Sequence, residues 1–82
     1  MPSYYVMWTV KDSNPDAPPF KGHLLDNPNL RQTTIETDSP AGVIEAIEEG
    51  SGRAEGAVVV QISEMIDIDM AEARAEYEAE LA

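Results

Sequence analysis

The sequence contains no cysteine, so it can form no disulfide bond and offers no thiolate to a metal ion. His23 is the one histidine, which excludes a site with several imidazole ligands and leaves little basis for acid–base catalysis. The longest aliphatic run, Ala57–Val60, falls far short of the roughly 20 apolar residues that a membrane-spanning helix needs. We therefore expect no catalytic residues, no enzymatic activity, no metal or cofactor and no membrane contact.

Basic residues are also scarce, with 5 lysines and arginines against 16 acids and a net charge of −11. Residues 1–35 are neutral overall, so the whole net charge comes from residues 36–82. An anionic surface repels nucleic acid and anionic membranes, whereas it attracts basic protein surfaces. We expect a basic protein partner and no direct contact with nucleic acid. Because the N-terminus shows no secretory signal pattern, we also expect a cytoplasmic location.

The 82 residues suffice for a single domain, residues 1–82, with one hydrophobic core. Ser3–Lys11 alternates like a strand and is apolar on both faces near its start, which favours a central position in a sheet. Leu30–Glu36 is polar and β-branched, as an edge strand would be. Ala57–Ile62 is a further strand, in which we expect Val58, Val60 and Ile62 to share one face. Phe20–Leu25 is a weaker strand candidate.

Two helices are predicted from their start signals. Ser39 can cap a helix over Pro40–Glu49, since serine is a good N-cap and proline suits the first helical position. Gly50 is expected to end that helix in the left-handed conformation, followed by a flexible connector over residues 50–56. Asp69 can cap the last helix, which we expect to run from Met70 to Leu81.

The resulting order is β-β-α-β-α, with a bulge or a bend near Ser63 and Glu64 after the strand at Ala57–Ile62. It predicts an α+β fold with a small, mainly antiparallel sheet of three to four strands and one helix packed on a face. Tyr5 and Met7 then lie opposite Trp8 and need cover. We expect the last helix to cover that other face, or a second subunit to do so in a homodimer.

Six glutamates are the candidate partner-binding residues, and they fall on the two predicted helices. The members are Glu45, Glu48 and Glu49 on the first helix and Glu72, Glu76 and Glu80 on the last. Glutamates four residues apart repel one another, and the first-helix cluster has no basic residue near it in the sequence, while only Arg74 lies among those of the last helix. They therefore indicate either a binding surface or a face that only keeps the protein soluble. The open connector after Gly50 favours the first cluster as the binding one.

Other chemistries have simpler explanations. His23 has no nucleophile and orienting carboxylate in a recognisable pattern, which indicates an ordinary loop histidine. Asp67 and Asp69 lack the glycine turn and ligand number of a calcium loop, so a strand end and a helix cap explain them. Residues 50–53 lack the lysine and the following helix of a phosphate-binding loop.

The arrangement as a whole resembles small phage-encoded inhibitors, among them anti-CRISPR and anti-restriction proteins. The resemblance rests on the aromatic first strand, the Thr37-Asp38-Ser39-Pro40 helix entry, the apolar positions Val43, Ile44 and Ile47, and the strand at residues 58–60. It implies a DNA mimic that occupies a basic nucleic-acid-binding surface of a defence complex in a bacterial host cell. Two alternatives stay open: an acidic immunity or antitoxin-like protein, and a small structural or oligomerisation module.

Overall fold

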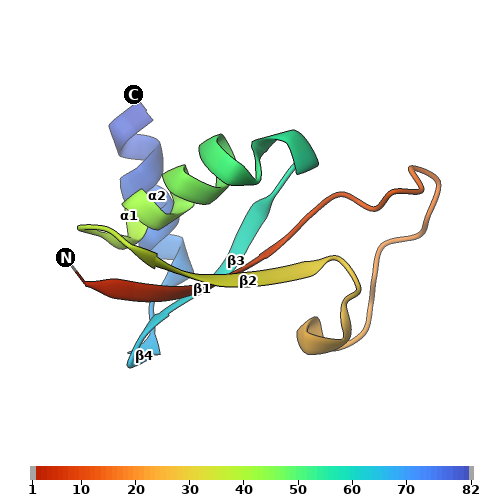
Figure 1. Cartoon of the computed structure of the whole chain (residues 1–82), viewed down its shortest axis with the longest axis horizontal. Helices are drawn as coiled ribbons and strands as arrows, with labels where there is room; N and C mark the ends of the chain where they lie inside the picture. The colour runs from red at the N-terminus through yellow and green to blue at the C-terminus, as the bar shows by residue number, and fades with distance from the viewer. Residues whose placement is uncertain (1, 82) are drawn as a thin grey trace.

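The computed structural model describes residues 2–81 and shows an α+β fold in which both helices lie above one four-stranded sheet (Figure 1). The main elements are β1 (Ser3–Thr9), β2 (Leu30–Glu36), α1 (Pro40–Ile44), β3 (Val58–Glu64), β4 (Ile66–Asp67) and α2 (Met70–Leu81). The strand order is β2-β1-β3-β4, and every neighbouring pair is antiparallel. The predicted fold class, the central first strand and the β2 edge strand are therefore confirmed.

β1 holds the sheet to the helices. Its side chains Tyr4 and Val6 are buried in the core, and Trp8 packs at the margin of the same cluster. The helices contribute Val43, Ile44 and Ile47. Because an aliphatic side chain gains about 1.5–3 kcal/mol on full burial, this cluster is the main source of stability in so short a chain.

A β-bulge in β3 changes which valines are buried. Met7 lies opposite Gln61 and Trp8 lies opposite Val59, so Val60 is an extra residue with no partner on β1. A bulge reverses the alternation of faces along its strand. The predicted common face of Val58, Val60 and Ile62 is wrong for this reason: Ile62 is buried together with Val59, whereas Val58 is 50% exposed.

The first helix begins as predicted and ends differently. Ser39 Oγ accepts a hydrogen bond from the Gly42 N–H at 3.3 Å, and Pro40 occupies the first turn. Beyond Ile44 the helix continues as a wider π-helical segment, Glu45–Ser51. Gly50 has φ −108°, so the expected left-handed stop at this residue is wrong. The left-handed glycine is Gly56, with φ 67°.

The connector that follows has a defined hydrogen-bond pattern in place of the expected open linker. Gly52 donates to the Ile47 carbonyl at 2.9 Å and accepts from the Ala57 N–H at 3.0 Å. A Cβ at Gly52 would collide with the Ala57 Cβ, which explains why glycine is needed at this crowded position. A short 3₁₀ helix, Arg53–Glu55, completes the connector.

The segment before β2 is a loop. The weak strand predicted at Phe20–Leu25 does not form, and the chain instead makes a 3₁₀ turn over Leu24–Asp26. His23 caps this turn, since its Nδ1 accepts a hydrogen bond from the Leu25 N–H at 3.2 Å. Two nearby prolines, Pro18 and Pro19, lack the N–H that a strand ladder requires.

α2 lies on the same face of the sheet as α1 (Figure 1). Asp69 caps it as predicted, with its Oδ1 2.9 Å from the Ala71 nitrogen. Ala73 and Tyr77 enter the common core, but Leu81 at the end of the helix is 59% exposed. The expectation that the last helix covers the other face is therefore wrong, because its short apolar line of alanine and tyrosine packs against α1 and β3.

The opposite face of the sheet stays open and needs less cover than the sequence suggested. Met7 is only 8% exposed, because it lies between Gln32 of β2 and Gln61 of β3 on that face. Tyr5 is 41% exposed, and its hydroxyl donates to Gln32 Oε1. Polar side chains on the neighbouring strands therefore cover part of the apolar surface for which a helix or a second subunit was expected.

Candidate anionic binding surface

The fold gathers the predicted acidic residues into one helical layer. Five of the six candidate glutamates are exposed: Glu45 and Glu49 on the first helix, and Glu72, Glu76 and Glu80 on α2. Both helices pack on the same face of the sheet, so the two clusters belong to the same layer of the fold. The centre of the opposite sheet face carries uncharged side chains.

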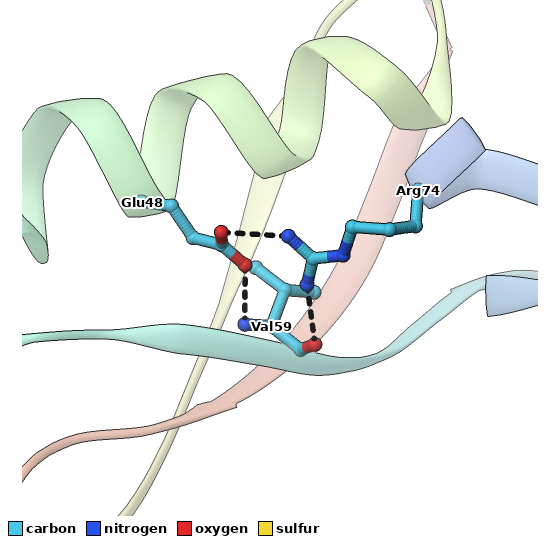
Figure 2. Close-up of polar contacts among 3 residues, drawn as sticks. All are labelled: Glu48, Val59 and Arg74. Atoms are coloured by element: carbon cyan, nitrogen blue, oxygen red, sulfur yellow. Dashed lines mark hydrogen bonds and ion pairs between the residues drawn. The ribbon is translucent and has the colours of Figure 1, made fainter. Parts of the chain in front are cut away.

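Glu48 is the exception among the six (Figure 2). Its Oε1 lies 2.7 Å from Nη1 of Arg74, and its Oε2 accepts the Val59 N–H at 2.9 Å. Arg74 in turn donates from Nη2 to the Val59 carbonyl at 3.2 Å. The three residues close a ring of charge-assisted hydrogen bonds across the outer edge of β3. Glu48 is therefore engaged inside the fold, and its role in partner binding stays a prediction.

Titration of Glu48 reflects these contacts. Partial burial by itself raises the carboxyl pKa, but the Arg74 hydrogen bond, the Val59 N–H and the Arg74 charge together lower it below its ordinary value of 4.5. The same hydrogen bond raises the pKa of the Arg74 guanidinium above its ordinary value. The pair is thus fully charged near neutral pH, and the one base of α2 is neutralised within the fold.

The exposed glutamates of the first helix have a cation near them. Glu45 and Glu49 line an open hollow together with Thr37 and Arg53. Burial and the Glu49 carboxylate both raise the pKa of the Tyr77 phenol on α2. The absence of cations that the sequence suggested for this cluster is therefore wrong: Arg74 contacts Glu48, and Arg53 shares the hollow.

The exposed glutamates of α2 have no such cation. Glu72 and Glu76 line a second hollow with Asp67 and Asp69, and none of its lining residues is basic. Asp69 Oδ1 is engaged by the backbone of α2, and Asp67 Oδ1 accepts hydrogen bonds from Gln61 and Ser63 on β3. Glu72 and Glu76 are left facing solvent. The hollow beside α2 is thus the one without a basic residue, whereas the sequence favoured the first-helix cluster for binding.

Within residues 2–81, no group of three or more histidine, cysteine, aspartate or glutamate side chains is placed to hold a metal ion. No helix in this described part of the chain is long and apolar enough to cross a membrane.

Sequence reasoning missed the link between Glu48 and Arg74, which are 26 residues apart. The one available signal was the composition of α2, where Arg74 is the only base among four glutamates. A lone arginine in such a helix is a candidate for an internal pairing, but the sequence does not say which glutamate it meets. Comparison of the chain with models of protein families, with curated proteins and with solved structures finds no match.

Proposed function

We propose that this protein is a small acidic binding protein whose exposed carboxylates occupy a basic, nucleic-acid-binding surface of another protein. The observation that carries the proposal is the orientation of Arg74. This arginine, the only base of α2, is directed toward Glu48 and Val59, while Glu72 and Glu76, each two residues from it along the helix, stay exposed. The outer surface of α2 therefore presents negative charge alone.

The spacing of these carboxylates supports an electrostatic role. Glu72, Glu76 and Glu80 follow one another at four-residue intervals, so each step along the helix is about 6 Å. Each like-charged pair at this spacing destabilises a helix by roughly 0.2–0.5 kcal/mol. A surface of mixed sign would provide solubility without that cost. A row of unpaired carboxylates suits a partner that normally neutralises phosphates with lysine and arginine.

The resemblance to anti-CRISPR and anti-restriction inhibitors gives the proposal its finer form. In that form the partner is a nucleic-acid-binding component of a defence complex in the bacterial cytoplasm, and the carboxylates act as a DNA mimic. An inhibitor of this kind needs no catalytic residue, because it acts by excluding the nucleic acid from its site.

A capture experiment tests this function. The protein is immobilised and exposed to bacterial lysate, and bound proteins are eluted in parallel with salt and with a short DNA duplex at low salt. We expect the same nucleic-acid-binding protein in both eluates, because DNA and the acidic surface compete for one basic site. Elution by salt but not by DNA would replace the proposal with an immunity or antitoxin-like role toward another basic protein. If no specific protein is captured, the remaining role of the exposed glutamates is to keep the protein soluble.

A further inference from the structure

The strands β3 and β2, which flank β1, differ in how their outward backbone groups are bonded. At the outer edge of β3, the Val59 N–H and carbonyl are both bonded to side chains, those of Glu48 and Arg74. Further along, the Ile62 carbonyl accepts the Ile68 N–H at 2.8 Å. At Val59 and Ile62, therefore, side chains and the chain's own backbone already engage these outward groups of β3.

The register of β1 and β2 determines which groups of β2 point away from the sheet. Beyond the two ends of this pair, Val10 donates to the Asn29 carbonyl at 3.0 Å and Thr37 donates to the Pro2 carbonyl at 3.2 Å. In an antiparallel pair the hydrogen-bonded positions recur at every second residue. The odd-numbered residues of β2 therefore bond to β1, and the even-numbered ones direct their backbone groups outward.

The outer edge of β2 is open as a result. Its outward N–H and carbonyl groups belong to Gln32, Thr34 and Glu36, and none of these groups has a hydrogen-bond partner among the described residues 2–81. The strand contains no proline or lysine, and its pairing with β1 runs without a bulge. The guanidinium of Arg31 folds back on the carbonyls of Pro28 and Leu30 and does not shield these groups. Apart from its charged residues Arg31 and Glu36, the strand therefore has none of the usual devices that protect a sheet edge.

Charge indicates what can occupy this edge. β2 lies beyond β1 at the far side of the sheet from β3, whereas α2 packs on α1 and β3. β2 itself carries one arginine and one glutamate, Arg31 and Glu36, and is neutral, so two copies of this acidic chain can meet at this edge without apposing their glutamate-rich helices. We propose that β2 pairs antiparallel with β2 of a second copy, centred on Thr34, to form one continuous sheet. This inference rests on the sheet edges and not on the proposed function.

The pairing is self-complementary in this register. It uses every open backbone group of Gln32, Thr34 and Glu36, and it sets Thr33 opposite Ile35, two β-branched residues that suit a cross-strand pair. Gln32 lies opposite Glu36 of the second copy. Since Gln32 Oε1 accepts the Tyr5 hydroxyl, its amide NH₂ is available to donate to that carboxylate. A two-fold axis perpendicular to the sheet then places both helical layers on one side, as a single broad anionic surface.

Sedimentation equilibrium of the purified protein over the micromolar range, with two neighbouring proline substitutions, tests the pairing. We expect wild type to reach twice the 9.0 kDa mass of the chain. Thr34→Pro removes an N–H that only the dimer uses, so this variant should stay at the single-chain mass with unchanged circular dichroism. Thr33→Pro is the matched control: it removes an N–H bonded to β1, and it should lower the thermal stability of the fold itself.

Amide hydrogen exchange gives an independent measurement on the unmodified chain. The Gln32, Thr34 and Glu36 amides should become protected as the protein concentration rises, while Thr33 is protected at every concentration. A wild type that stays at the single-chain mass would overturn the proposal. A dimer that survives Thr34→Pro but dissociates in Tyr5→Glu would overturn it in favour of association through the open sheet face.

Discussion

Arg74 Nη1 and Glu48 Oε1 lie 2.7 Å apart and connect α2 to the first helix across the outer edge of β3. Both side chains also bond to the backbone of Val59, one at its N–H and one at its carbonyl. The pair therefore joins the two helices and bonds the outward backbone groups of Val59 on β3. It also directs the one base of α2 away from the exposed glutamates.

Removal of Arg74 should destabilise the fold. Arg74→Met keeps much of the side-chain volume but leaves the Glu48 carboxylate, whose side chain is only 17% exposed, without its cation. Hydrogen bonds to charged groups contribute about 1.5–3 kcal/mol, and exposed ion pairs contribute less than about 1 kcal/mol. We expect a loss of about 1–3 kcal/mol in the free energy of unfolding, measured by denaturant titration.

A double-mutant cycle separates the pair from its surroundings. The combined variant Glu48→Gln and Arg74→Met should lose less stability than the sum of the two single variants, because each single change leaves one partner unpaired. Strict additivity would mean that the two side chains do not interact in solution.

The Glu48 carboxylate should also give a specific pH dependence. Its pKa in the folded protein is lower than the ordinary value of 4.5, so it favours folding when ionised. That contribution is complete above the ordinary carboxyl range and is lost as the pH falls through the lowered pKa. Wild type should therefore exceed Glu48→Gln in stability near neutral pH, and the two unfolding curves should converge in acid. A difference that stays constant over this pH range would contradict the assigned contacts.

Met65 tests the turn between β3 and β4. It is the one non-glycine residue with positive φ (67°) in residues 2–81, and its side chain lies fully in solvent. Glycine tolerates this conformation, whereas a β-branched residue there is strongly disfavoured. Met65→Gly should melt at or slightly above the wild-type temperature, and Met65→Val should be less stable than Met65→Gly by about 1–2 kcal/mol. Equal stability of the two variants would show that the turn adopts another conformation.

The local parts of this fold could be predicted from local signals. Alternating apolar residues indicate β1, and Ser39 and Asp69 mark the two helix starts because side-chain caps act within three residues. The edge position of β2 follows from its polar, β-branched composition. Each of these features depends on neighbours in the sequence.

The remaining features depend on contacts between distant residues. The bulge at Val60 reflects how β3 fits β1, and a run of three valines gives no sign of where alternation breaks. The position of α2 depends on whether Ala73 and Tyr77 fit against α1, which their sequence spacing does not determine. In the candidate site the exposed glutamates were found from charge alone, but the internal role of Glu48 depends on an arginine from another helix.

The most direct test measures how charge-reversal variants of this protein bind the partner that was purified by capture. Three double variants carry the same change in net charge: Glu72→Lys with Glu76→Lys, Glu45→Lys with Glu49→Lys, and Asp12→Lys with Asp16→Lys in the N-terminal loop. Each is checked by circular dichroism and melting, and then measured as a competitor of duplex DNA for the partner.

We predict that wild type displaces the DNA and does so less well as salt rises, since exposed charges are screened over about 8–10 Å. The α2 variant should lose displacement, because like charges apposed at an interface cost several kcal/mol. The first-helix variant should lose less, and the loop variant should compete like wild type. Equal competition by all three folded variants would contradict the account, because the acidic surface would then play no part in binding.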